Sequence, residues 1–163
     1  MRTFGIDPGT TSIGYAIVDG EREPLLRASG LINIAGRGEG RLLELHQELL
    51  SLLKHWKPER VSVEKLYFAK NTKTALAVSE ARGVILLTTT LAGCRLYEYT
   101  PLEVKKAVTG DGGADKLQLK KMVQLTLPDT AKMKARDDVF DAIGLALTCI
   151  FKEKSFPFKK LSA

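Results

Sequence analysis

Four carboxylates in this 163-residue sequence lie where a charge is unusual. Asp7 and Glu64 each end a short apolar segment, GID and RVSVE, where an unpaired charge would be costly to bury. Asp138 and Asp141 are three residues apart in ARDDVFDAIGLALTCIF, so on a helix their side chains share one face and repel each other. A cation beside these acids would remove both difficulties.

An oxygen-only set of this kind, without His or Cys, suits Mg²⁺ or Mn²⁺. Two such ions, about 3.5 to 4 Å apart, would clamp the attacking water and the leaving oxygen of a phosphodiester hydrolysis. Simpler interpretations stay open for single residues. An acid at a strand end can reach solvent, and Asp137 and Asp138 in a first helical turn would be stabilised by the helix dipole by roughly 0.3 to 1 kcal/mol without a metal. Asp141 lies a turn further in, where that explanation fades.

The turn after Asp7 allows a second chemistry. The segment DPGTTS joins two expected strands, and in actin-like ATPases a similar turn wraps a nucleotide phosphate. Those ATPases need two domains that face each other across the nucleotide, whereas this length corresponds to one domain. The sequence therefore favours a metal ligand at Asp7.

The order of the expected elements indicates how these acids meet. Strands are expected over 2–7, 12–19, about 25–35, 59–65 and 95–100, and helices over 41–56, about 71–91, after Pro101, over 116–127 and from about 137 to 152. This is an α/β chain with a five-stranded mixed sheet flanked by helices, in the order of the RNase H-like fold. In that fold the first and fourth strands are adjacent and the last helix crosses them.

The same pattern predicts one domain over residues 1–152 and a basic, mobile tail over residues 153–163. Gly83 lies inside the helix expected over about 71–91, where glycine costs about 1 kcal/mol relative to alanine. We interpret it as a mark of close approach by another backbone.

The positive charge is concentrated in the middle of the chain. The net charge is +6, and residues 65–136 hold 13 Lys and Arg against 6 Asp and Glu. A localised basic surface favours a polyanionic partner such as nucleic acid, although a solvated charged face explains charge alone equally well.

The sequence has no leader-like segment and no apolar run of membrane-spanning length, so we expect a cytoplasmic protein with no membrane contact. Its cysteines lack metal-binding spacing, so we expect reduced thiols.

Aromatic and basic residues follow the acids. Tyr67 and Phe68 come soon after Glu64 and ahead of Lys70, so an aromatic ring there could stack on an unpaired base, the alternative being that both rings are core. Lys116 follows a glycine-containing loop at a helix start, where the helix dipole disfavours a cation. That position indicates a phosphate contact, and an ordinary solvated lysine is the alternative.

Five motifs, in this order, resemble the RuvC family of bacterial Holliday-junction resolvases. They are GIDPG with GYAIV, VEKLYFAKN, ALAVSEARGVIL, YTPLEVKKAVTGDGGADKLQLKKMV and ARDDVFDAIGLAL, and the resemblance extends to about residue 152. It implies that Asp7, Glu64, Asp138 and Asp141 are the metal-binding catalytic acids and that Lys116 is an active-site lysine. The residues expected to contact DNA are Tyr67, Phe68, Lys70, Lys105, Lys106, Lys116 and Lys120.

The resemblance also implies an activity. The protein would be a structure-selective endonuclease of recombination and repair, resolving four-way DNA junctions by paired, symmetric cuts that leave 5′-phosphate and 3′-hydroxyl ends. It would use two Mg²⁺ ions per active site, with Mn²⁺ able to substitute, and act as a homodimer. Because a two-fold substrate calls for a two-fold enzyme, we take the Gly83-containing helix, expected over about 71–91, as the candidate interface. RuvA and RuvB branch-migration proteins are the implied partners. Thr10, Thr11 and Lys65 depart from the usual family residues without being ligands.

Two other functions stay open at this point. A YqgF-like RNase H-fold nuclease acting on RNA would share the first motif and some of the acids, but should lack the GDGGADKLQLKK segment. A catalytically inactive junction-binding module would keep the basic middle of the chain and show no Mg²⁺-dependent nicking.

Overall fold

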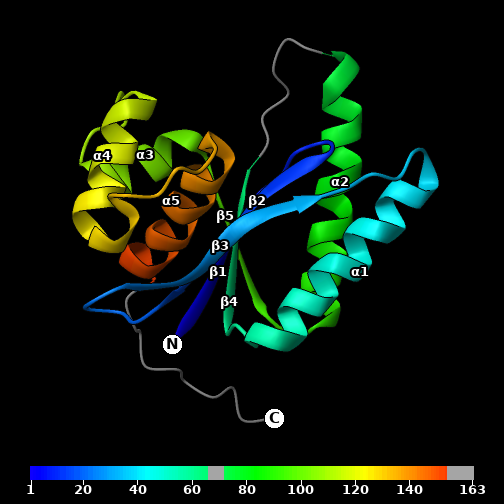
Figure 1. The fold of residues 1–163 in the computed structure, drawn as a ribbon, viewed down its shortest axis with the longest axis horizontal. Helices are drawn as coiled ribbons and strands as arrows, with labels where there is room; N and C mark the ends of the chain where they lie inside the picture. Colours follow the sequence, from blue (N-terminus) through cyan, green and yellow to red (C-terminus); the bar gives the residue numbers. More distant parts are fainter. Residues whose placement is uncertain (66–71, 154–163) are drawn as a thin grey trace, which may run out of the picture.

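A five-stranded sheet lies at the centre of the computed structural model, which describes residues 1–65 and 72–153 (Figure 1). Its strands are β1 (Arg2–Asp7), β2 (Ser12–Asp19), β3 (Leu25–Asn33), β4 (Arg60–Glu64) and β5 (Arg95–Tyr99), in the order β3-β2-β1-β4-β5. β1 and β3 each pair antiparallel with β2, whereas β4 is parallel to both β1 and β5. The mixed sheet expected from the sequence is therefore confirmed.

Helices cover both faces of the sheet. α1 (Glu39–Trp56) and α2 (Thr72–Leu91) lie on one face, and α3 (Pro101–Thr109), α4 (Lys116–Thr126) and α5 (Asp137–Lys152) lie on the other (Figure 1). A short 3-10 helix, Pro128–Thr130, follows α4. Because strand side chains alternate, Ile17 packs with the first pair of helices while Ala16 and Val18 pack with α5 and its neighbours. Two hydrophobic layers result, one on each face.

Capping residues fix the helices that face the candidate site. Thr100 and Glu103 form a reciprocal capping box at the start of α3, and Asp115 and Gln118 form another at the start of α4. Gly110, with φ of 83°, ends α3 in a left-handed conformation that glycine adopts without strain. Gly110 and the Asp115 cap lie at the two ends of the turn between α3 and α4. They therefore set the position of Lys116, the first residue of α4.

The element bounds differ from expectation in a few places. β3 ends at Asn33, two residues early, and α1 begins at Glu39, directly after Gly38 with φ of 56°. Gly83 is exposed, and among residues 1–65 and 72–153 nothing beyond its own stretch of helix lies within 4 Å of the position its Cβ would take. The expected close approach at Gly83 is thus wrong within a single chain.

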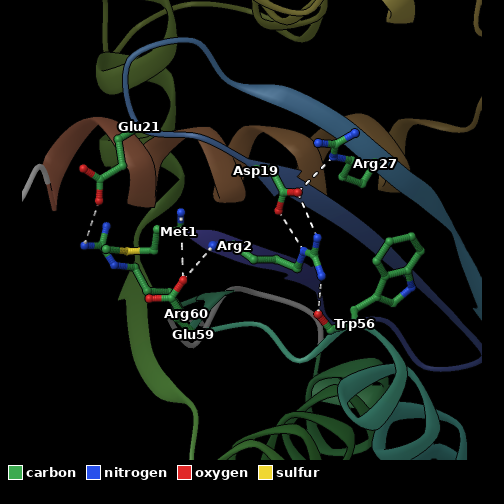
Figure 2. A network of polar contacts seen from close by, with 8 residues as sticks. All are labelled: Met1, Arg2, Asp19, Glu21, Arg27, Trp56, Glu59 and Arg60. Atoms are coloured by element: carbon green, nitrogen blue, oxygen red, sulfur yellow. Dashed lines mark hydrogen bonds and ion pairs between the residues drawn. The ribbon is translucent and has the colours of Figure 1, made fainter.

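A polar network anchors the start of β1, at the end of the sheet opposite Asp7 (Figure 2). Arg2 donates to both carboxylate oxygens of Asp19, at 2.7 and 2.9 Å, and to the backbone oxygen of Trp56 at 2.7 Å. Arg27 donates to the same carboxylate at 2.9 Å. The beginning of β1 is therefore tied to the end of β2 and to the end of α1. Within residues 1–65 and 72–153, no helix is long and apolar enough to cross a membrane.

Candidate active site

Two of the four acids end adjacent parallel strands. Ile6 of β1 is paired with Val63 of β4, so Asp7 and Glu64, the last residues of their strands, lie at the same level. After Asp7 the chain must turn sharply, and a Cβ at Gly9 would lie 2.0 Å from the backbone oxygen of Ser12. Only glycine fits this turn. The sheet thus brings the two acids side by side, as the sequence predicted.

Two glycines let α5 approach the sheet closely enough to bring the other acids. A Cβ at Gly5 of β1 would lie 2.0 Å from the backbone oxygen of Ala142, and one at Gly14 of β2 would lie 2.0 Å from that of Asp138. Both strands therefore need glycine where α5 crosses them. Sequence reasoning missed this role, although the signal was present as a glycine inside each of the two apolar strands.

Three acids and two lysines line a common cavity of about 340 Å³. Its lining residues are Asp7, Glu64, Pro101, Val104, Lys105, Lys116, Leu119, Asp141 and Leu145. They come from β1, β4, α3, α4 and α5, which are far apart in the sequence. Carboxylates and lysines therefore line the same cavity, a combination that could bind both a cation and a phosphodiester.

Burial and mutual repulsion raise the pKa values of the three acids that line this cavity. Burial is the main cause at Asp7, and repulsion from Glu64 and then from the two α5 acids adds to it, raising the pKa of Asp7 to about 8. Burial, then repulsion by Asp141, raises the pKa of Glu64. Burial likewise raises the pKa of Asp141. The positive charge of Lys116 opposes the shift at all three residues.

Lys116 lies between two acids of α5. Its Nζ is 3.6 Å from a carboxylate oxygen of Asp141 and 3.7 Å from one of Asp137. Attraction by Asp141 is the main cause that raises the pKa of Lys116 above its ordinary value. The ammonium is thus held charged at the mouth of the cavity, where it could contact an incoming phosphate.

Asp138 lies at the edge of the group. It is not among the residues that line the cavity, and Arg136 pairs with it at 3.2 Å. Its charge nevertheless adds to the repulsion felt by Asp7. The structure therefore gathers Asp7, Glu64 and Asp141 at one cavity and leaves Asp138 at its margin, turned to a neighbouring arginine.

The described part of the chain holds no ready-made metal site, because no group of three or more His, Cys, Asp or Glu in it is arranged to bind an ion. The cation beside Asp141 in this arrangement is the Lys116 ammonium. The donor set still fits a hard metal ion, since its oxygen ligands are partly buried and repel one another, and a bound cation would relieve that repulsion. Asp7, Glu64, Asp138 and Asp141 are the residues that would hold it.

The described lysines that are expected to bind DNA lie on α3 and α4, two of the helices that line this cavity. Lys105 lines it, and Lys106 is exposed on the same helix. Lys120 lines an adjoining hollow of about 100 Å³, with its ammonium 4.5 Å from the ring centre of Phe140. The expected contacts at Tyr67, Phe68 and Lys70 lie outside the described residues.

Comparison with known proteins decides between the families that share this type of fold. Residues 3–149 match the family model described as crossover junction endodeoxyribonuclease RuvC. The chain belongs to the RuvC family. It is 44% identical to RuvC of Brevibacillus brevis over 151 residues, covering 91% of this chain and 90% of the relative. It is 39% identical to RuvC of Caldicellulosiruptor saccharolyticus over 164 residues, covering 98% of each.

Solved structures agree with this assignment. The structure of Thermus thermophilus RuvC superposes with a TM-score of 0.83 at 30% identity, covering 93% of this chain and 94% of that one. The same protein in complex with a Holliday junction substrate gives a TM-score of 0.85 at 31% identity, with 93% of each chain covered. The yeast mitochondrial Holliday junction resolvase Ydc2, at 12% identity and a TM-score of 0.69, shares the fold. The RNase H-like fold expected from the sequence is confirmed.

Proposed function

We propose that this protein is a metal-dependent endonuclease that resolves Holliday junctions in recombination and repair. The observation that carries the proposal is the convergence of Asp7, Glu64 and Asp141, from three separate segments, on one cavity in a chain of the RuvC family. The relatives' names state crossover junction endodeoxyribonuclease activity, and one related structure contains a Holliday junction. Residues 1–152 are the proposed nuclease domain, and the tail expected over residues 153–163 lies outside the described residues except for Glu153.

The reaction is hydrolysis of a phosphodiester in which water adds to phosphorus and the bond to the 3′ oxygen breaks. The products are a 5′-phosphate and a 3′-hydroxyl end. Two Mg²⁺ ions held by Asp7, Glu64, Asp138 and Asp141, with Mn²⁺ able to substitute, would supply an activated water and stabilise the leaving oxygen. The four side chains would hold and orient those ions, and three of them, Asp7, Glu64 and Asp141, are partly shielded from solvent.

Lys116 and the other lysines act on the phosphate backbone in this proposal. Lys116 balances the charge of Asp141 in the absence of DNA and turns to the scissile phosphate when DNA enters the cavity. Lys105, Lys106 and Lys120 hold the flanking phosphates. Tyr67 and Phe68 are proposed to stack on a base at the crossover, with Lys70 beside them, and these three roles remain predictions from the sequence.

A homodimer is proposed because a four-way junction offers two equivalent strands to cut. The exposed face of α2 supports this assembly: Leu76, Leu87 and Leu91 are 68%, 59% and 71% exposed, at spacings that place them along one side of the helix. Gly83 lies on the same side with open space above it. An apolar stripe with a gap for a second backbone suits a partner helix.

The remaining parts of the proposal follow from the family. RuvA and RuvB branch-migration proteins are the proposed partners. Chromosomal DNA of bacteria lies in the cytoplasm, so the protein is placed there. The GDGGADKLQLKK segment, which forms the α3–α4 turn and the start of α4, favours this function over a YqgF-like nuclease acting on RNA.

The proposal is tested by incubating the protein with a synthetic four-way junction, a matched duplex and an RNA–DNA hybrid, each with Mg²⁺ or with EDTA. We expect nicking of the junction alone, and only with Mg²⁺. Cleavage of the hybrid in preference to the junction would support the RNA-acting alternative. Junction binding with no cleavage under any metal would support an inactive binding module.

A further inference from the structure

Two arginines connect α2, the proposed dimer helix, to the strand ends that carry the acids. Both are partly buried, at 21% exposure for the Arg82 side chain and 12% for that of Arg41. Neither was expected from the sequence to have a role. Their contacts join segments that are far apart in the chain. The two arginines therefore position the elements of the site and do not take part in the reaction.

Arg82 of α2 reaches the ends of β4 and β5. Its Nε donates to the backbone oxygen of Glu64 at 3.3 Å, and its guanidinium pairs with the carboxylate of Glu98. Glu98 lies on β5 in register with Val63, the residue before Glu64. One side chain therefore fixes α2 to the end of the strand that carries Glu64.

Arg41 of α1 reaches the turn that follows Asp7. Its Nη1 donates to the backbone oxygen of Thr10 at 3.1 Å and to that of Ala77 of α2 at 3.4 Å. Its Nη2 pairs with Glu80 of α2 at 2.8 Å. The guanidinium thus joins the turn after Asp7 to α2. Its contact Glu80 lies one helical turn after the exposed Leu76.

We propose that Arg82 and Arg41 are positioning residues through which pairing of two subunits at α2 sets the positions of Glu64 and Asp7. This inference rests on the proposed function, because it uses the α2 dimer and the metal-binding acids. A partner helix on the stripe of Leu76, Gly83 and Leu87 restrains α2, and the two arginines pass that restraint to the strand ends. The metal ligands are then preorganised in the dimer and looser in a lone subunit.

The coupling gives the enzyme a way to avoid single cuts. An isolated subunit would bind metal weakly and cut slowly, whereas a dimer would have both sites assembled together. Coupling between two sites is reciprocal, so metal that binds the ordered acids must also tighten the dimer. This reciprocity makes the proposal measurable without DNA.

The first experiment measures Mn²⁺ affinity by calorimetric titration of the DNA-free protein, with Asp7→Asn as the reference for lost binding. We expect Arg82→Gln to weaken Mn²⁺ binding by about 10-fold, a typical effect for residues that orient ligands, and Arg82→Lys to recover part of it. Arg22→Gln, an exposed residue of the β2–β3 turn, is the matched control and should change nothing. Glu98→Gln weakens the same brace by removing the charge on β5 that pairs with Arg82, and gives a second route should Arg82→Gln fold poorly.

The second experiment tests the connection to the dimer. Leu87→Asp should yield a monomer in sedimentation and lower the Mn²⁺ affinity about 10-fold. Adding Arg82→Gln to this variant should lower the Mn²⁺ affinity little further, because both changes remove the same restraint. Unchanged Mn²⁺ affinity in both Arg82→Gln and Glu98→Gln overturns the positioning role. A Leu87→Asp protein that stays dimeric, or additive losses in the double variant, overturns the coupling through α2. Failure of the wild type to cut junctions would instead count against the proposed function.

Discussion

Asp7 is the residue on which the proposed chemistry depends most, because it lies at the strand end where all the other acids act on it. Replacing it by Asn, or making the changes Glu64→Gln, Asp138→Asn and Asp141→Asn, keeps the shape and removes a metal-binding charge. We expect each variant to lose at least about 100-fold in single-turnover cleavage, since metal-activated water supplies several kcal/mol of the rate. Junction affinity, measured by gel shift in EDTA, should change less than about threefold.

Asp129→Asn is the matched control for those four changes. Asp129 is an exposed residue of the short helix Pro128–Thr130, at the opposite end of α4 from Lys116. Asp137→Asn should also retain activity, since Asp137 meets Lys116 only in an exposed ion pair. Near-normal metal-dependent cutting by any of the four acid variants would remove that acid from the proposed site.

The raised pKa of Asp7 predicts how pH affects stability without metal. Its pKa of about 8 in the folded chain exceeds the ordinary value of 3.8, so folding takes up a proton between these two pH values. The free energy of unfolding must then fall as pH rises through this window. In EDTA we expect the Tm of the wild type to drop from pH 5 to pH 8. Asp7→Asn should raise Tm at pH 8 by a few degrees, since about 1 kcal/mol of stability corresponds to about 2 to 4 °C in a chain of this size. Parallel Tm curves for the wild type and Asp7→Asn would contradict this origin of the shift.

Among the elements, α5 depends on two glycines for its place across the sheet. Gly5→Ala puts a Cβ 2.0 Å from a backbone oxygen of α5, and the rigid backbone on both sides leaves little room to adjust. We expect the free energy of unfolding, measured in urea, to fall by about 1 to 3 kcal/mol. Cleavage should also fall, because α5 carries Asp138 and Asp141. Gly40→Ala, in α1 with open space around it, is the matched control and should stabilise by about 0.4 to 1 kcal/mol. Equal effects of the two changes would show that α5 is not closely held.

The elements were largely predictable from the sequence, whereas the contacts between them were not. Alternation in β2 and the proline after Thr100 are local signals, and they predict strand and helix bounds within a few residues. Strand order placed Asp7 beside Glu64. The braces made by Arg41 and Arg82 depend on helix positions relative to the sheet, which no local pattern encodes, so sequence reasoning did not find them.

At the scale of the whole molecule, DNA affinity and the rate of cleavage should depend on different lysines. Phosphate contacts release counterions, so the logarithm of affinity should fall by about 0.9 per contact for each unit of log salt. Lys106→Ala should therefore weaken junction binding and lower this slope by about 1. Lys54→Ala, an exposed lysine of α1 on the other face of the sheet, should leave the slope unchanged. Lys116→Ala should instead reduce cleavage at saturating enzyme, and a slope change as large as that of Lys106→Ala would make it a binding residue.

The central claim is that one dimer cuts both equivalent strands of a junction with metal. A supercoiled plasmid that extrudes a cruciform tests it directly, because two cuts across the junction yield linear DNA while a single cut relaxes the cruciform and leaves a nicked circle. With Mg²⁺ we expect linear product as the main species from the earliest times, and none with EDTA or with Asp7→Asn. Accumulation of nicked circles ahead of linear DNA, or linear product in EDTA, would contradict the account.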